Sequence, residues 1–459
     1  MALASGFVDR LCEIFPRDAL TVDAAECLAY GYDNSRRHAQ PDAVVFPASH
    51  EQVVALVSAC RAERVPITAR GRGTNTTGAT VPTEGGVVLS FERMNRIVRI
   101  DTDNRYAVVE PGVLNGDLQT ALAAHGFFWP PDPTSSPYCS IGGNLACNAA
   151  GPRAVKYGSC RENTLGLRAV AGTGEEFRCG TYTTKGATGY DLTRLLIGAE
   201  GTLALITEAT LKLTPKPAAK RTLRATYIDV NAAAAAVARI MAQPVVPCAL
   251  EFLDDESLRL SRERDGDGIP DAGAMLMIEV DGAADDLARA AEAVAAAARG
   301  NGMIELRIAA NGAEADALWR ARKALSPALR AISPNKINED VVVPVAQLPQ
   351  LVEMLRDISR RHRVSIVSFG HAGNGNMHVN ILPRDDEMKR AESALSDLFD
   401  LVIKLGGTLS GEHGIGLAKR DFLQRAIDAD ALSLMHKIKS QFDPDGILNP
   451  GKLLPAVER

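Results

Sequence analysis

Residues 364–382 read VSIVSFGHAGNGNMHVNIL and place two apolar runs on either side of a short turn rich in glycine and asparagine. This pattern predicts a β-hairpin with its turn at AGNGN. His371 closes the first strand and His378 lies within the second. We therefore expect the two imidazoles to lie face to face across the hairpin, with opposed Cβ atoms about 5 Å apart. Because side chains alternate along a strand, Asn380 shares the face of His378.

This hairpin belongs to a pattern that occurs twice in the second half of the chain. The first copy reads strand, helix, strand, strand, helix, strand in RATYIDV, VNAAAAAVARIMAQ, CALEFL, AMLMIEV, DLARAAEAVAAAARG and MIELRI. The second copy runs in the same order from DVVVPV to GTLSGEHG, and the hairpin supplies its two middle strands. Both copies match the ferredoxin-like βαββαβ pattern. We expect one eight-stranded antiparallel sheet with helices over one face.

The first half of the chain is rich in glycine and asparagine. In the loop GRGTNTTGA (71–79), Ala79 stands where a Walker A motif needs lysine, and the strand-like VPTEGGVVLS that follows excludes a Rossmann fingerprint. A loop whose backbone N–H groups cradle a pyrophosphate, or a plain turn, remains. Further glycine runs, IGGNLACNAAG and GAEGTLA, favour close backbone approach to a large, flat ligand.

Composition excludes several classes of protein. The chain has 459 residues, 46% of them hydrophobic, and a net charge of −5, which argues against a nucleic-acid partner. No apolar run reaches the roughly 18 residues of a membrane span, and the start of the chain lacks a signal-peptide pattern. No C-x-x-C pair occurs, so iron–sulfur and cysteine-zinc sites are not expected. We expect a cytoplasmic protein with reduced thiols.

The histidines suggest a metal site. Three of the eight histidines fall in the hairpin and in SGEHGIG, where Glu412 and His413 are adjacent. Two imidazoles and a carboxylate leave open coordination positions, as a catalytic metal requires. Zinc is the first choice, and manganese or iron are alternatives. The side chains of neighbours in an extended segment diverge, so one can bind metal while the other faces the reaction. Ordinary polar turn residues or buried core histidines are the alternative interpretation.

A family resemblance rests on seven motifs within roughly residues 20–455: ARGRGTNTTGA, PPDPTSSPYCSIGGNLACNAAG, KYGSCREN, TGYDLTRLLIGAEGTLALITEATL, GHAGNGNMH, SGEHGIG and FDPDGILNPGK. In combination they resemble the flavoproteins of the vanillyl-alcohol oxidase/p-cresol methylhydroxylase (PCMH) type, in their D-2-hydroxy-acid dehydrogenase branch. The resemblance implies an α+β protein with a PCMH-type FAD-binding domain (1–215), a substrate-binding cap of two ferredoxin-like units with the metal site (216–425), and a C-terminal helix and tail returning to the FAD domain (426–459).

The resemblance also implies roles for individual residues. His371, His378 and Glu412 match the family's metal ligands, and His413 matches its catalytic base. The residues that would hold or border FAD are Arg70, Gly71, Arg72, Gly73, Thr74, Asn75, Gly78, Pro133, Thr134, Ser135, Ile141, Gly142, Gly143, Asn144, Asn148, Gly151, Glu200, Gly201, Ile206 and Asn449. Glu200, Gly201 and Ile206 would approach the adenine and ribose.

Two positions depart from the family pattern. Arg72 stands where many relatives have glycine, and Asn374 stands where aspartate is common. The loop 66–80 contains no histidine, so FAD is expected to bind without a covalent histidyl link.

The expected reaction is oxidation of a D-2-hydroxy acid to the 2-keto acid by hydride transfer to flavin N5. Arg322 and Lys336 are candidate cations for the substrate carboxylate, and Ser326, one turn after Arg322, can add a hydrogen bond. A solvated helix charge is the alternative for Arg322, and Asn338 can replace Lys336. His378-Val379-Asn380 resembles the H-x-N of D-2-hydroxyglutarate dehydrogenases more than the versions in glycolate oxidase, and this resemblance favours D-2-hydroxyglutarate, with D-lactate next.

Other functions stay open at this point. A glycolate or D-lactate oxidase-type subunit, a metal hydrolase and a non-catalytic FAD-binding electron-transfer module are the alternatives. For the dehydrogenase we expect a quinone or an electron-transfer flavoprotein as electron acceptor, no membrane span, and a homodimer as the commonest assembly.

Overall fold

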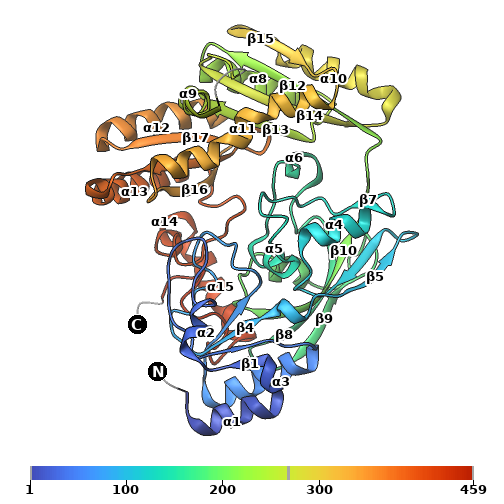
Figure 1. Cartoon of the computed structure of the whole chain (residues 1–459), viewed down its shortest axis with the longest axis vertical. Coiled ribbons are helices and arrows are strands. Elements are labelled where there is room, and N and C mark those ends of the chain that lie inside the picture. The colour runs from blue at the N-terminus through green and yellow to red at the C-terminus, as the bar shows by residue number, and fades with distance from the viewer. Residues whose placement is uncertain (1–2, 266–268, 457–459) are drawn as a thin grey trace. The chain divides into compact units, whose positions relative to one another are not determined.

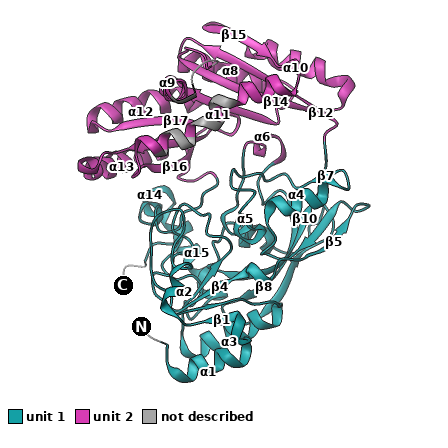
Figure 2. Ribbon diagram, viewed as in Figure 1, with its two compact units in different colours: residues 1–151, 158–216, 412–459 teal, residues 152–157, 217–411 magenta. Residues whose placement is uncertain are grey.

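The structure is a computed structural model that describes residues 3–265 and 269–456. The chain divides into two compact units, which Figure 2 draws in different colours. The first unit contains residues 1–151, 158–216 and 412–459, and the second contains residues 152–157 and 217–411. The second unit is therefore an insertion into the first. The returning segment begins at Glu412, whereas position 426 was expected from the sequence.

A four-stranded sheet forms the N-terminal part of the first unit, in the order β1-β2-β4-β3. β4 is parallel to both β2 and β3, and the crossover helix α3 begins where Ser49 Oγ accepts the Gln52 N–H. Buried aliphatic residues of α1, α3 and the strands form one core here. The elements are α1 (Ser5–Ile14), β1 (Leu20–Thr21), α2 (Ala24–Leu28), β2 (Ala43–Val45), α3 (His50–Glu63), β3 (Ile67–Arg70) and β4 (Val87–Ser90).

A five-stranded antiparallel sheet, β5-β6-β10-β8-β9, forms the other part of the first unit. Its core surrounds the fully buried Trp129. The elements are β5 (Ile97–Asp101), β6 (Tyr106–Val109), α4 (Asn115–Ala123), β7 (Phe127–Phe128), α5 (Ile141–Cys147), β8 (Thr164–Ala171), β9 (Glu176–Gly180), α7 (Leu192–Leu196), β10 (Ala204–Lys212), β11 (Thr214–Pro215), α14 (Leu423–Ala426) and α15 (Ala429–Phe442).

The second unit contains a seven-stranded sheet in the order β15-β12-β14-β13-β17-β18-β16 (Figure 1). All its pairings are antiparallel, and β13 and β17 join the two ferredoxin-like copies. The two-copy prediction is confirmed. The strands are β12 (Ala219–Tyr227), β13 (Ala249–Asp254), β14 (Ala274–Gly282), β15 (Met303–Ile308), β16 (Ile337–Val342), β17 (Ser365–His371) and β18 (Asn376–Leu382).

The predicted eighth strand, GTLSGEHG, is wrong. Only Thr408 pairs with the sheet, in an isolated bridge to Val342. Two glycines in the left-handed region bound the segment, Gly406 (φ 74°) just before it and Gly414 (φ 84°) at its end, and extended strand geometry does not allow this conformation. The segment is therefore a loop, and this loop carries Glu412 and His413.

Helices pack on both faces of the sheet, whereas one face was expected. α10, α8, α12 and α13 lie side by side in that order, while α9 and α11 pair with each other and contact β12, β13, β14 and β17. Helix α9, between β13 and β14, was not predicted. The helices are α6 (Ala154–Tyr157), α8 (Val230–Ala242), α9 (Asp255–Asp265), α10 (Ala284–Ala298), α11 (Gly312–Ile332), α12 (Leu348–His362) and α13 (Met388–Lys404).

The length and polarity of the helices decide whether any of them could cross a membrane. α11 has 21 residues and carries arginines, a lysine and acidic residues along its length. Among the described residues, no helix is both long enough and apolar enough to cross a membrane.

Candidate functional site

The histidine hairpin forms as predicted from β17 and β18, but its two histidines are not directly opposed. His371 pairs with Asn376, and His378 pairs with Phe369. The two histidines therefore lie on the same face of the sheet, but their positions are offset by two residues. Their rings approach each other as diagonal neighbours on the two strands. The turn requires Gly375, which has φ 72° and whose added Cβ would lie 1.9 Å from the Val343 carbonyl oxygen.

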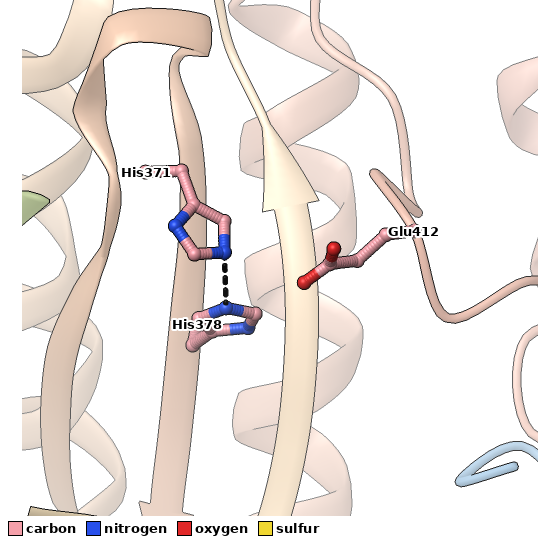
Figure 3. A group of neighbouring side chains, drawn as sticks. All are labelled: His371, His378 and Glu412. Carbon is pink, nitrogen blue, oxygen red and sulfur yellow. Dashed lines mark hydrogen bonds between the residues drawn. The ribbon is translucent and has the colours of Figure 1, made fainter. Parts of the chain in front are cut away.

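The two imidazoles meet at their Nε2 atoms, which are 3.4 Å apart (Figure 3). Both residues are buried. Two ligands of one tetrahedral zinc ion, each at about 2.0–2.1 Å, would be separated by about 3.4 Å. The spacing of the nitrogens therefore fits a shared metal ion.

Glu412 completes the set. Ligand atoms of His371, His378 and Glu412 lie within 4.8 Å of one another. The preceding loop is attached to β16, because Asp340 accepts the Gly411 N–H at 2.9 Å and the Ser410 hydroxyl at 3.0 Å. Two imidazoles and one carboxylate suit zinc, manganese or iron, so the donor set fits the predicted divalent ion.

A second carboxylate, Glu251 on β13, contacts the same site. Its two oxygens contact His371 Nδ1 and Arg322 Nε, the latter at 2.8 Å. Burial alone would raise the pKa of Glu251, but its contacts with His371 and Arg322 outweigh burial and hold this pKa well below its usual range. Sequence analysis missed this residue. The only signal was one charged position within the apolar strand CALEFL.

Three of the four predicted substrate residues are described in full. Asn380 is fully buried, and its Oδ1 accepts a hydrogen bond from Lys336 Nζ at 3.1 Å. Arg322 is half-buried on α11, with its guanidinium 4.7 Å from the centre of the Phe369 ring. All three project toward the sheet face that carries His378. Ser326 lies on α11, but its side chain is outside the described residues.

His413 follows Glu412 and lies in the first unit. Its carbonyl oxygen accepts a hydrogen bond from Asn75 Nδ2 at 3.0 Å. Two residues later, the N–H groups of Ile415 and Gly416 donate to the buried carboxylate of Glu200. The segment that carries the predicted base is thus attached to two segments predicted to hold FAD.

The glycine-rich loop after β3 is shaped by its own side chains. Arg70 turns its guanidinium to the Tyr32 carbonyl oxygen at 2.6 Å, and a Cβ on Gly73 (φ 65°) would lie 2.3 Å from that guanidinium. Asn75 Oδ1 accepts the Thr77 N–H at 2.9 Å. Arg72, the departure from the family pattern, lies 3.4 Å from Glu92. Side chains of the loop itself, Arg70 and Asn75, therefore fix part of its conformation.

The other residues predicted to border FAD all fall in the first unit. Asn449 connects two of the segments, because its Nδ2 donates to the carbonyl oxygens of Ala79 (2.9 Å) and Glu200 (2.7 Å). The loop after β3 contains Thr74 and Gly78, and a turn contains Pro133, Thr134 and Ser135. Helix α5 carries Ile141, Gly142, Gly143 and Asn144 and is followed by Asn148 and Gly151. Strand β10 carries Ile206 and is preceded by Glu200 and Gly201.

Comparison with known families identifies this architecture. Residues 41–180 match the FAD binding domain, and residues 216–453 match the family of FAD linked oxidases, C-terminal domain. The second match spans more than half of the chain. The chain belongs to the FAD-linked oxidase family. The protein is therefore an FAD-linked oxidoreductase, and the glycine-rich first unit is its FAD-binding part.

Individual relatives match nearly the full length of the chain. The glycolate oxidase subunit GlcD of Bacillus subtilis is 41% identical over 93% of this chain and 92% of its own. The D-lactate dehydrogenase of Archaeoglobus fulgidus is 33% identical over 97% of this chain and 98% of its own.

Solved structures of low sequence identity show the same fold. p-Cresol methylhydroxylase aligns over 98% of this chain and 97% of its own, with a TM-score of 0.81 and 18% identity. An alkyldihydroxyacetonephosphate synthase aligns over 98% of this chain and 86% of its own, with a TM-score of 0.77 and 22% identity. The predicted PCMH-type fold is confirmed.

Proposed function

We propose that the protein oxidises a D-2-hydroxy acid to the 2-keto acid with FAD and a divalent metal ion. The observation that carries the proposal is the set of His371, His378 and Glu412, whose ligand atoms lie within 4.8 Å of one another in a member of the FAD-linked oxidase family. Relatives named glycolate oxidase and D-lactate dehydrogenase support a 2-hydroxy acid as substrate.

Oxidation of an alcohol requires that a proton leave the hydroxyl and a hydride leave the carbon. Bound FAD would accept the hydride at N5, and a bound divalent ion would lower the pKa of the substrate hydroxyl. His371, His378 and Glu412 would hold the ion. His413 takes the hydroxyl proton as general base, because the lone pair of a neutral imidazole nitrogen can accept it.

Fixed cations orient the substrate. Lys336 and Arg322 bind its carboxylate, and Asn380 holds Lys336 Nζ through its side-chain oxygen. FAD binds without a covalent link, since the loop 66–80 contains no histidine. The electrons leave to a quinone or an electron-transfer flavoprotein.

Two observations favour different 2-hydroxy acids as the substrate. The motif His378-Val379-Asn380, by its resemblance to D-2-hydroxyglutarate dehydrogenases, favours D-2-hydroxyglutarate, with D-lactate next. The name of the Bacillus subtilis glycolate oxidase subunit, which is 41% identical, favours glycolate. All three acids share the 2-hydroxy carboxylate that the proposed residues bind.

Anaerobic mixing of the purified flavoprotein with glycolate and with both enantiomers of lactate and 2-hydroxyglutarate tests the proposal. We expect the visible flavin absorbance to bleach with a D-acid or glycolate and to persist with the L-acids. Removal of metal with a chelator should stop bleaching, and added Zn²⁺ or Mn²⁺ should restore it. Bleaching that survives complete metal removal would contradict the metal's role.

The role of His413 is tested separately. His413→Ala should slow flavin reduction by about 10²–10⁴-fold, the usual contribution of a general base, while FAD and metal content stay unchanged. The control is His125→Ala, which removes an exposed imidazole from the same unit. Reduction by His413→Ala at the wild-type rate would exclude it as the base.

A further inference from the structure

A fully buried carboxylate outside the predicted metal set contacts one of its imidazoles. Glu251 on β13 is 0% exposed, and its register partner on β17 is His371. Both side chains therefore project from the same face of the sheet. One carboxylate oxygen of Glu251 contacts His371 Nδ1, and the other accepts the Nε–H of Arg322 at 2.8 Å.

This contact leaves His371 a single nitrogen for a metal. A neutral imidazole carries one N–H and one lone pair, and an ionised carboxylate only accepts hydrogen bonds. The N–H of His371 is therefore on Nδ1, and its lone pair is on Nε2. That Nε2 atom is the one that lies 3.4 Å from His378 Nε2.

We propose that Glu251 is a positioning residue for metal binding, which fixes His371 as the Nδ1–H tautomer and aims its Nε2 at the ion. The proposal rests on the proposed function, because it takes His371 as a metal ligand. An outer carboxylate of this kind orients the ligand ring and raises its basicity. Loss of such a partner typically weakens metal affinity by about 10–100-fold.

Arg322 gives the same carboxylate a second role. Its Nε–H holds Glu251, and its guanidinium lies over the ring of Phe369, the register partner of His378. Arg322 is also a proposed ligand of the substrate carboxylate. One buried carboxylate thus positions both a metal ligand and a substrate-binding cation, so its loss should also raise KM.

A purely structural role for Glu251 makes a different prediction. In that case the ion pair with Arg322 only fastens α11 to the sheet, and its loss lowers stability without affecting the metal. Glu279 on β14 is the matched control. It projects from the same face, because Glu251 pairs with Met277. It accepts hydrogen bonds from Trp319 Nε1 of the same helix at 2.9 Å and from Thr222 Oγ1 at 2.8 Å.

Zinc titration separates the two roles. Flavin-loaded wild type, Glu251→Gln and Glu279→Gln are stripped of metal and titrated with Zn²⁺ against a chromophoric chelator at one pH. We expect a loss of about 10–100-fold in Zn²⁺ affinity for Glu251→Gln and wild-type affinity for Glu279→Gln. Equal affinities of wild type and Glu251→Gln would overturn the role of Glu251. A wild type that does not bind Zn²⁺ would instead overturn the proposed function.

A double-mutant cycle tests whether Glu251 acts through His371. In a His371→Asn background, Glu251→Gln should cause no further loss of Zn²⁺ affinity, because the imidazole it positions is absent. An undiminished further loss would show that Glu251 acts by another route.

The wild type alone provides a test that does not depend on folding of a variant. In Zn²⁺-loaded protein with ¹⁵N-labelled histidine, His371 should show a protonated Nδ1 and a metal-shifted Nε2. Metal on Nδ1, or a proton on Nε2, would overturn the proposal.

Discussion

Glu200 shows how burial and hydrogen bonding oppose each other at one residue. It is 4% exposed, and its carboxylate accepts the N–H groups of Ile415 at 2.6 Å and Gly416 at 2.9 Å. Burial raises the pKa of Glu200 to about 7, although these two N–H groups lower it. The segment that carries His413 is therefore attached to a carboxylate that titrates near neutral pH.

We predict that Glu200 makes the folded protein less stable as pH rises from about 5 to 7. Its pKa is about 7 when folded and near 4.5 as a free side chain. Between these values the folded state binds more protons than the unfolded state, so the free energy of unfolding falls with rising pH, by roughly 1–3 kcal/mol. Glu200→Gln cannot ionise and should lose this component.

Thermal unfolding between pH 5 and 8 measures this effect. The control is Glu175→Gln, an exposed glutamate of the same unit. If the melting temperatures of Glu200→Gln and wild type follow parallel pH profiles, Glu200 does not titrate in this range.

Some residues of the site are predictable from the sequence and others are not. His371, His378 and Glu412 were found from sequence because two lie in one hairpin and the third lies in a short glycine-bounded motif. Glu251 contacts His371 from 120 positions away. Only the register of β13 against β17 brings them together, and register between distant strands is not readable from one sequence.

At the scale of elements, the packing of α11 against the sheet depends on a few apolar residues. Leu325 is fully buried and packs with Leu253 and Phe369 of the sheet. We predict that Leu325→Ala destabilises the second unit by about 2–5 kcal/mol, through lost burial and a cavity. Ile332→Ala on the same helix should change stability by less than about 0.5 kcal/mol, because Ile332 is 52% exposed. Denaturant unfolding of both variants measures the difference.

The link between β16 and the loop before Glu412 gives a second prediction at this scale. Asp340 is fully buried and accepts hydrogen bonds from Ser410 and Gly411. Asp340→Asn places an amide N–H group against these donors, so the loop should detach and Zn²⁺ affinity should fall by about 10–100-fold.

The control for Asp340 is another buried carboxylate of the same sheet. Asp254 accepts hydrogen bonds from Ser257 on α9 and Ser368 on β17. Asp254→Asn should lower stability and leave Zn²⁺ affinity unchanged. Equal affinities for the two variants would show that Asp340 does not position Glu412.

Alternation and helical periodicity predicted most elements of the second unit, because each strand is bounded by turn residues. The failures have physical causes. GTLSGEHG alternates like a strand, but Gly406 just before it and Gly414 at its end adopt left-handed conformations, and only Thr408 pairs with the sheet. The polar composition of Asp255–Asp265 does not predict a helix, although the segment forms one in which Leu258 and Leu260 are buried.

At the scale of the whole molecule, the first unit is built from both ends of the chain. Ile67 on β3 donates its N–H to Ile447 and accepts the Asn449 N–H, both at 2.7 Å. Ile447 and Leu448 belong to the core around α3. The C-terminal segment is therefore a structural part of the FAD-binding unit.

We predict that a chain ending at Ile427 does not form a stable FAD-binding unit. It lacks α15, the pairing partners of Ile67 and the amide of Asn449. Melting temperature and FAD content after purification measure this effect. A chain ending at Ala456 keeps all of these contacts and should match the full chain. Retention of FAD by the shorter chain would contradict the prediction.

The insertion of one unit into the other also sets an order of events during synthesis. The ribosome delivers every residue of the inserted unit before Ile447, Leu448 and Asn449 emerge. Until then, the nascent first unit has an unpaired edge at β3, and the carbonyl groups of Ala79 and Glu200 lack their amide donor. We therefore expect stable binding of the flavin only after residues 447–449 have left the ribosomal exit tunnel and paired with β3.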